Sequence, residues 1–102
     1  MKNLKLTTKT IQEQIFNTLK EAIEPYLQEP IHEDSWYSIV CLIEEMFKSF
    51  IQERNILRFK ILCNNICSDL IIEYDINFSQ GFFLYCHLRK GHLKINFVPK
   101  EF

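Results

Sequence analysis

The sequence is short of the residues that build loops and linkers. Its 102 residues include two glycines and three prolines, and Ala22 is the single alanine. Two glycines cannot form the glycine-rich loops that bind phosphates, and a chain this poor in glycine and proline is neither disordered nor mostly loop. Because the length leaves no room for a second domain, we expect one domain over residues 1–102.

An excess of charge of one sign is also absent. Twelve basic and thirteen acidic side chains leave a formal net charge of −1, whereas nucleic-acid binders typically carry a clustered basic stripe. No uncharged run approaches the roughly 20 apolar residues that a membrane span needs. The basic start of the chain is not followed by an apolar stretch, so we expect no signal peptide.

The four cysteines are Cys41, Cys63, Cys67 and Cys86. In a chain without a targeting segment, they are most simply free thiols in a reducing compartment. The sequence therefore predicts a cytoplasmic protein.

Apolar residues recur at three- and four-residue steps in the first half of the chain, which predicts two amphipathic helices. The first is expected over residues 8–24, with Thr7 as its N-cap and Pro25 ending it. A linker is expected over 25–31.

The second helix is expected over residues 34–53, with a stripe that starts at Trp36. Asp34 is its expected N-cap, at the end where the helix dipole favours negative charge. Asn55 is expected to adopt the left-handed backbone conformation just after the helix.

From Ile56 onward the apolar period changes to two, which predicts four strands over residues 56–63, 70–78, 82–89 and 92–98. One register of the first hairpin joins apolar residues on one face and opposite charges on the other. Its pairs are Phe59 with Tyr74, Ile61 with Ile72, Arg58 with Asp75, and Lys60 with Glu73. In the last hairpin, the expected pairs are Leu84 with Phe97, Cys86 with Ile95, and Leu88 with Leu93.

The predicted fold class is α+β, with two N-terminal helices packed on one face of a four-stranded antiparallel meander (ααββββ) in a single two-layer domain. The opposite face of the sheet is expected to carry charged and aromatic side chains: Arg58, Lys60, Glu73, Asp75, Phe83, Tyr85, His87 and Lys94.

Metal binding is one hypothesis for the function. Cys63 and Cys67 have three residues between them, and His87 and His92 are five apart, spacings that occur in zinc sites. The nineteen residues between Cys67 and His87 exceed the spacing of familiar zinc fingers. The simpler interpretation is one core thiol, one loop thiol and two surface histidines, and we expect no metal or other cofactor.

Catalysis is disfavoured by the same residues. A nucleophilic cysteine needs a lowered pKa and access to substrate, but Cys86 is expected to face the core while His87 faces away from it. The paired carboxylates Glu73 and Asp75 already have cations opposite them. We therefore predict a protein that is not an enzyme.

Binding to a protein partner is the leading prediction. Exposed aromatics beside basic residues are typical of protein interface hot spots and also stack on single-stranded nucleic acid. The neutral charge balance favours the protein partner over nucleic acid. The predicted partner-binding residues are Arg58, Lys60, Phe83, Tyr85, His87 and Lys94.

The first and fourth strands are the expected edges of the sheet, and an uncovered edge can accept a strand from another chain. Self-association is one form of such pairing. The alternative is that Lys94, Pro99 and Lys100 are placed there to block it.

Two segments resemble a family of contractile-tail proteins. They are the helix-to-strand segment 50–61, with Glu53 and Arg54 at its corner, and the following strand 70–76; the stretch 30–36 is also loosely similar. The resemblance is to sheath-initiator (baseplate-wedge) proteins and to the C-terminal domain of tail-sheath proteins, in phage tails and related injection machines. It implies a structural role in a virion or similar machine, with the first strand as a paired edge.

The predicted function is therefore a non-catalytic interaction module, a structural component of a larger assembly that uses its sheet edges. Two alternatives remain open. One is a small cytosolic immunity protein, antitoxin or inhibitor that binds a single protein. The other is a small zinc-binding or nucleic-acid-binding module.

Overall fold

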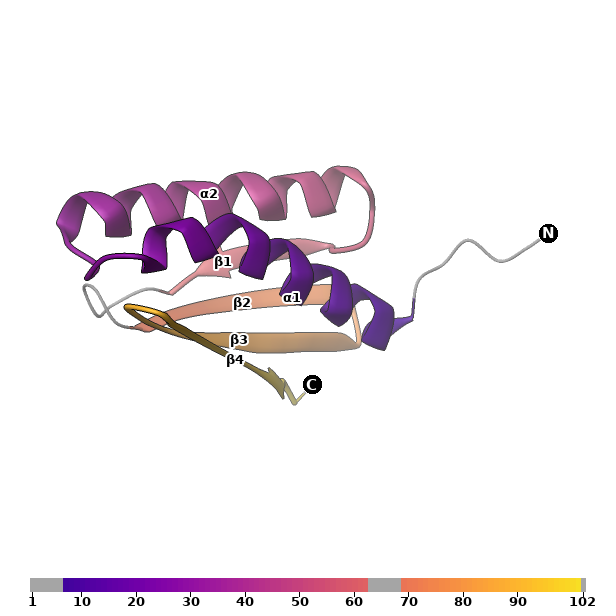
Figure 1. The fold of residues 1–102 in the computed structure, drawn as a ribbon. Coiled ribbons are helices and arrows are strands. Elements are labelled where there is room, and N and C mark those ends of the chain that lie inside the picture. The colour runs from indigo at the N-terminus through magenta and orange to yellow at the C-terminus, as the bar shows by residue number, and fades with distance from the viewer. Residues whose placement is uncertain (1–6, 63–68, 102) are drawn as a thin grey trace.

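The structure, a computed structural model, describes residues 7–62 and 69–101. Two helices lie on one face of a four-stranded antiparallel sheet with strand order β1-β2-β3-β4 (Figure 1). This is the predicted α+β arrangement. Its elements are α1 (Thr8–Ile23), η1 (Glu24–Leu27, a 3-10 helix), α2 (Glu33–Gln52), β1 (Arg58–Ile61), β2 (Asp69–Asn77), β3 (Gln80–Arg89) and β4 (His92–Pro99).

The start of α1 follows the prediction. The Thr7 hydroxyl accepts a hydrogen bond from the Thr10 N–H at 3.1 Å, which makes Thr7 the N-cap. The helix ends at Ile23, and Pro25 lies in the first turn of η1. The predicted linker is thus partly helical, because η1 turns the chain so that Leu27 is buried in the core.

The predictions for both ends of α2 need correction. The N-cap is His32 rather than Asp34, because His32 is the last residue with extended backbone and Asp34 lies inside the first turn. At the other end, Arg54 rather than Asn55 is left-handed, with φ of 64°. The N–H groups of Arg54 and Asn55 bond to the carbonyls of Ile51 and Phe50, which is the Schellman pattern.

The predicted strand registers are confirmed in both hairpins. The boundaries differ in every strand, and β2 covers Asp69–Asn77 rather than 70–78. β1 begins at Arg58, because the Ile56 N–H bonds to the Phe50 carbonyl at 3.4 Å rather than to β2, and its predicted end at 63 lies outside the described residues. β3 begins at Gln80, because the Asn77 side chain accepts the Ser79 N–H at 2.7 Å and closes a tighter turn. β4 continues through Pro99.

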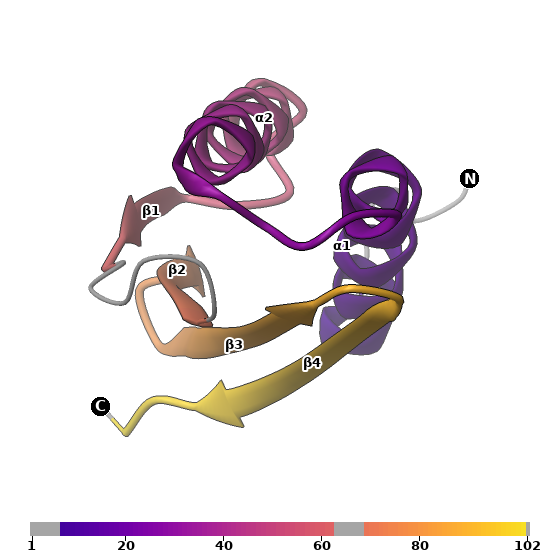
Figure 2. The same ribbon diagram turned by 60° about the vertical axis from the view of Figure 1, so that its left-hand side comes forward.

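The core fills the space between the helices and the sheet. In Figure 2, α2 lies above β1 and β2, while α1 lies on the side of β3 and β4. Phe47 is fully buried at the centre, with its ring centroid 5.4 to 5.9 Å from those of Phe50, Phe59 and Tyr74. The turn between β3 and β4 joins the helical layer through the Gly91 N–H, which donates to the Leu27 carbonyl at 2.7 Å.

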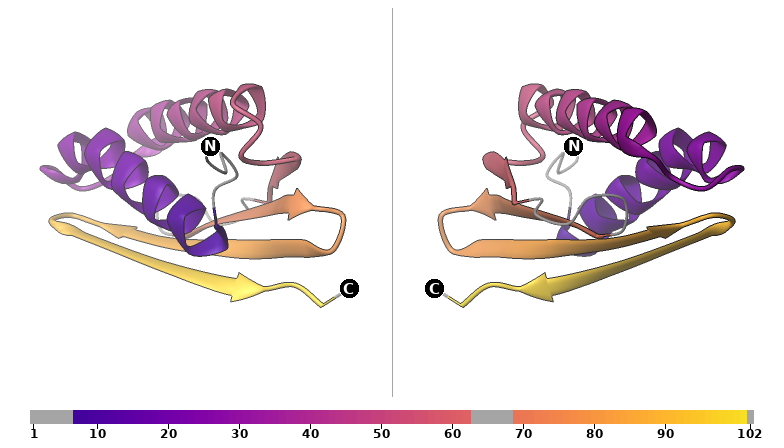
Figure 3. Two further views of the ribbon diagram at one scale, coloured as in Figure 1. Left: turned by 90° about the vertical axis from the view of Figure 1, so that its right-hand side faces the viewer. Right: turned by 90° about the vertical axis from the view of Figure 1, so that its left-hand side faces the viewer.

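Both helices cover the same face, and the opposite face carries no helix of the described chain (Figure 3). No helix in the described part of the chain has the length and apolar character needed to cross a membrane.

Candidate protein-interaction surface

The predicted partner-binding residues lie together on the face of the sheet that the helices leave uncovered. Arg58 and Lys60 come from β1, Phe83, Tyr85 and His87 from β3, and Lys94 from β4. They alternate along the strands with residues that face the helices, such as Leu84, Cys86 and Leu88, which are buried. We call this surface the open face.

The centre of the open face is apolar. The rings of Phe83 and Tyr85 pack together with centroids 6.4 Å apart, and Tyr85 remains 41% exposed. Val98 on β4 pairs with Phe83, and Ile71 on β2 pairs with Tyr85. These four side chains, Ile71, Phe83, Tyr85 and Val98, form what we call the apolar patch.

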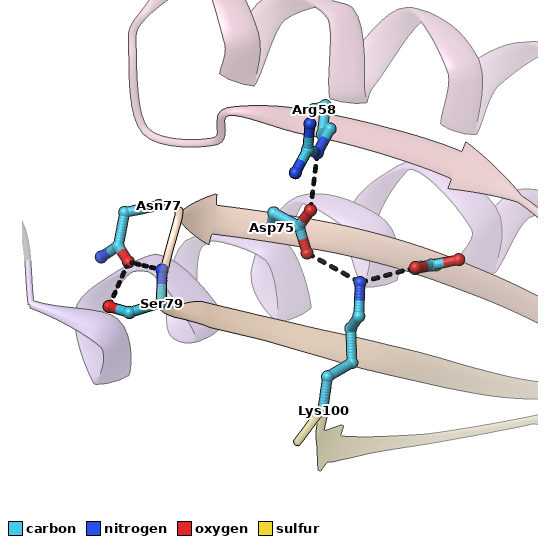
Figure 4. A network of polar contacts seen from close by, with 6 residues as sticks. Arg58, Asp75, Asn77, Ser79 and Lys100 are labelled. Carbon is cyan, nitrogen blue, oxygen red and sulfur yellow. Dashed lines mark hydrogen bonds and ion pairs between the residues drawn. The ribbon is translucent and has the colours of Figure 1, made fainter. Parts of the chain in front are cut away.

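A network of charges borders the apolar patch on one side (Figure 4). Asp75 is 5% exposed and accepts a hydrogen bond from Arg58 Nε at 2.7 Å. Lys100 reaches over the sheet, with its Nζ 2.9 Å from Asp75 and 2.5 Å from Glu73. The ammonium also lies 5.9 Å from the ring centroid of Phe83, within the range of a cation–π contact.

The network changes the pKa values of its members. Burial by itself raises the pKa of Asp75, but the hydrogen bonds from Arg58 and Lys100 outweigh burial and hold this pKa below its ordinary value. The hydrogen bonds of Lys100 to Glu73 and Asp75 raise the pKa of its ammonium. Both groups are therefore charged at neutral pH, and each stabilises the other.

The opposite side of the apolar patch is also polar. His87 Nδ1 lies 2.5 Å from Asp69 Oδ1, and Lys94 faces His87 across the ladder. A hollow of about 540 Å³ lies here, lined in part by Tyr85, His87, Lys94 and Asn96. The apolar patch is therefore enclosed between two rows of charged residues.

Of the four residues in the zinc hypothesis, the structure describes the two histidines. Cys63 and Cys67 lie outside the described residues, and His92 stands exposed at the start of β4. The described residues contain no group of three or more side chains arranged to hold a metal ion.

The remaining cysteines do not have the setting of a nucleophile. Burial raises the pKa of the Cys86 thiol to about 12, so it stays protonated at neutral pH. Cys41 is exposed on α2, away from the open face.

Several residues of the open face were not predicted from the sequence, namely Asp69, Ile71, Val98 and Lys100. The alternation along β2 and β4 would have placed Ile71 and Val98 there. Lys100 continues the same alternation but lies beyond the strand expected over 92–98. The structure instead shows the Lys100 N–H bonded to the Gly81 carbonyl at 2.8 Å, so strand pairing extends past the proline.

Comparison with known proteins gives no match: no protein-family model, curated protein or solved structure is significantly similar to this chain. The resemblance to contractile-tail proteins therefore stays a prediction.

Proposed function

We propose that this protein is a non-catalytic interaction module that binds a protein partner through its open face, as a component of a larger assembly. The observation that supports the proposal is the apolar patch enclosed between two charged rows. Protein interfaces have this anatomy, with an apolar and aromatic centre surrounded by a polar rim that excludes water.

The charges of the open face indicate the chemistry of the partner. Lys60 and Lys94, on opposite sides of the apolar patch, make no ion pair with any other described residue. A partner that places an apolar side chain against Tyr85 and carboxylates near the two lysines would complement the surface. Charge pairs of this kind act mainly on specificity and on the rate of association.

The acidic residues of the open face favour a protein partner over a nucleic acid. Asp69, Glu73 and Asp75 lie on the same face as the aromatics, and Glu73 is directly beside Phe83 in the ladder. A backbone of phosphates that followed the aromatics would pass these carboxylates. Single-strand binders instead combine stacking aromatics with a continuous basic groove.

The experiment is affinity capture from the native source with the wild type and two variants, followed by quantitative mass spectrometry. Tyr85→Arg places a charge in the apolar patch, and Tyr37→Arg makes the same change on α2, where Tyr37 is 72% exposed. We expect Tyr85→Arg to reduce capture of the partner at least about tenfold, as for a hot-spot residue. Tyr37→Arg should leave capture unchanged.

Equal loss of the partner with both variants, or with neither, would contradict binding through the open face. The identity of the captured proteins separates the two interaction hypotheses. Several structural proteins captured in fixed ratios support an assembly component. A single enzyme or toxin supports an inhibitor instead.

A further inference from the structure

We propose that two copies of this chain join through the outer edges of their β4 strands, running antiparallel, with Ile95 facing Ile95 of the second copy. The two sheets then form one continuous sheet. This inference uses the backbone edge of β4 rather than the side chains of the open face, and it does not depend on the proposed function.

The hydrogen-bonding groups along the outer edge of β4 have no backbone partner among the described residues. Among the described residues β4 pairs only with β3. The Lys100 N–H bonds to Gly81, the residue that the register places opposite it. Because bonded and non-bonded pairs alternate in an antiparallel ladder, residues 94, 96 and 98 also bond to β3. The N–H and C=O groups of Leu93, Ile95 and Phe97 therefore point outward.

Pro99 supports this assignment. It falls in the outward-pointing set, the position in an edge strand where a missing N–H costs no bond to the neighbouring strand. The chain can therefore continue its pairing to β3 at Lys100.

Apart from Pro99 at its end, the β4 edge lacks the features that usually prevent strand pairing. Natural edge strands are protected by bulges, shortness, proline or charged side chains that point inward. β4 has a continuous register with β3 and eight residues, and its three outward-bonding residues are all apolar. The sequence makes Lys100 a candidate for blocking strand pairing, but Glu73 and Asp75 hold its side chain over the sheet instead. β1, the other edge, has only four residues.

The core is also incomplete at β4. Leu93, Ile95 and Phe97 face the helices but are only partly buried, whereas their partners on β3, Leu88, Cys86 and Leu84, are buried. An added strand with apolar side chains on the same face would cover them.

One register satisfies the edge of both copies. With Ile95 facing Ile95, Leu93 faces Phe97 of the second copy, and Lys94 faces Asn96. Every outward N–H and C=O of Leu93, Ile95 and Phe97 then has a partner. Shifting the register one way opposes Lys94 to Lys94 of the second copy. Shifting it the other way opposes Leu93 to Pro99, which has no N–H to donate. The strand is therefore complementary to itself.

An exposed side chain in the helical layer also favours a second copy of this chain as the partner of β4. Phe16 on α1 is 40% exposed and shares with Lys20, His92 and Leu93 the lining of a groove of about 490 Å³. A twofold axis through the facing Ile95 residues puts both helical layers on the same side of the joined sheet. Phe97 of the second copy, opposite Leu93, then lies beside this groove and covers Phe16.

The first test is sedimentation velocity of the wild-type chain over a range of concentrations, combined with amide exchange by NMR. We expect a species of twice the 12.3 kDa chain mass. In that species the amides of Leu93, Ile95 and Phe97 should be protected. On dilution to the monomer their exchange should accelerate, while that of Lys94, Asn96 and Val98 stays slow, because those amides bond to β3.

The second test uses variants. Ile95→Lys places a charge in the paired edge and should abolish the dimer, whereas Lys94→Gln, which faces Asn96, should leave it. Tyr85→Arg should also leave the dimer, so failure of the proposed function and failure of this inference can be told apart. The exchange measurement needs no variant and remains informative if Ile95→Lys does not fold.

Three results would overturn the proposal. One is a monomer at every concentration. Another is a dimer in which the amides of Leu93, Ile95 and Phe97 exchange freely, which would place the contact elsewhere. The third is protection of these amides only when a different protein is added, which would make that protein the occupant of the edge.

Discussion

The two faces of the sheet are made by the same strands but are stabilised in different ways. On the helix-covered face, alternate residues such as Leu70, Ile72 and Leu84 are fully buried and contribute through the hydrophobic effect. On the open face, the residues between them form an ion-paired network around Asp75 and leave apolar side chains exposed. Period-two alternation thus separates a buried apolar face from a charged and partly exposed face, and changes on each face should have different consequences.

The largest effect is expected at the centre of the covered face. Phe47→Ala removes a fully buried ring that contacts three other aromatic rings, and should lower the free energy of unfolding by about 3–5 kcal/mol. Phe78→Ala is the matched control, because Phe78 is 80% exposed, and should change stability by less than about 0.5 kcal/mol. Urea denaturation measures both. Similar losses would mean that Phe47 is not the centre of the core.

A smaller effect is expected on the open face. Asp75→Ala leaves Arg58 and Lys100 without this carboxylate and should lower the free energy of unfolding by about 1–3 kcal/mol. The loss stays in this range because Arg58 is largely exposed, so that water compensates part of it. Glu44→Ala is the control, because Glu44 is an exposed carboxylate on α2, and it should change the free energy of unfolding little. A change at Asp75 no larger than at Glu44 would show that the network adds no stability.

The pH dependence of stability tests whether the contribution of the open face is electrostatic. The pKa of Asp75 is lowered from 3.8, so its stabilisation is present above pH 3.8 and is lost as the pH falls through the lowered pKa. The pKa of Lys100 is raised from 10.5, so its contribution is present below pH 10.5 and is lost as the pH rises through the raised pKa. The stability difference between wild type and Asp75→Asn should therefore be greatest between these limits and shrink in acid. A difference independent of pH would exclude this electrostatic origin.

The strand registers could be predicted because two independent patterns required the same alignment. In the first hairpin, pairing Phe59 with Tyr74 also pairs Arg58 with Asp75, and a slip of one residue would break both. The start of α2 could not be predicted in the same way, because adjacent polar residues suit either the cap or the first turn. His32, Glu33 and Asp34 are such a run, so the sequence does not decide which one is the cap.

The network around Asp75 could not be predicted in full, because it depends on where the chain goes after Pro99. The register predicted the pair of Lys60 with Glu73, and the backbone confirms this pairing. The Glu73 carboxylate, however, contacts Lys100 from beyond β4, and no described ion pair joins it to Lys60. Side-chain reach across a sheet is a three-dimensional property that strand alternation alone does not contain.

The smallest effect is expected at a polar atom on the covered face. The Tyr74 hydroxyl is buried and makes no hydrogen bond with any described residue. Burial raises the pKa of Tyr74, while the side chain of Gln12, outside hydrogen-bonding geometry, lowers it to a lesser degree. Because a buried hydroxyl without a partner is destabilising, Tyr74→Phe should leave stability unchanged or raise it by up to about 1 kcal/mol.

Urea denaturation of Tyr74→Phe, Gln12→Ala and the double variant tests this expectation. If the hydroxyl has no partner, the two changes should be additive within about 0.5 kcal/mol. A coupling larger than this, together with a loss of stability in Tyr74→Phe, would mean that Gln12 does bond to the hydroxyl. The covered face would then hold a polar contact of its own, and the separation between an apolar face and an ion-paired face would be less complete than the burial of Leu70, Ile72 and Leu84 indicates.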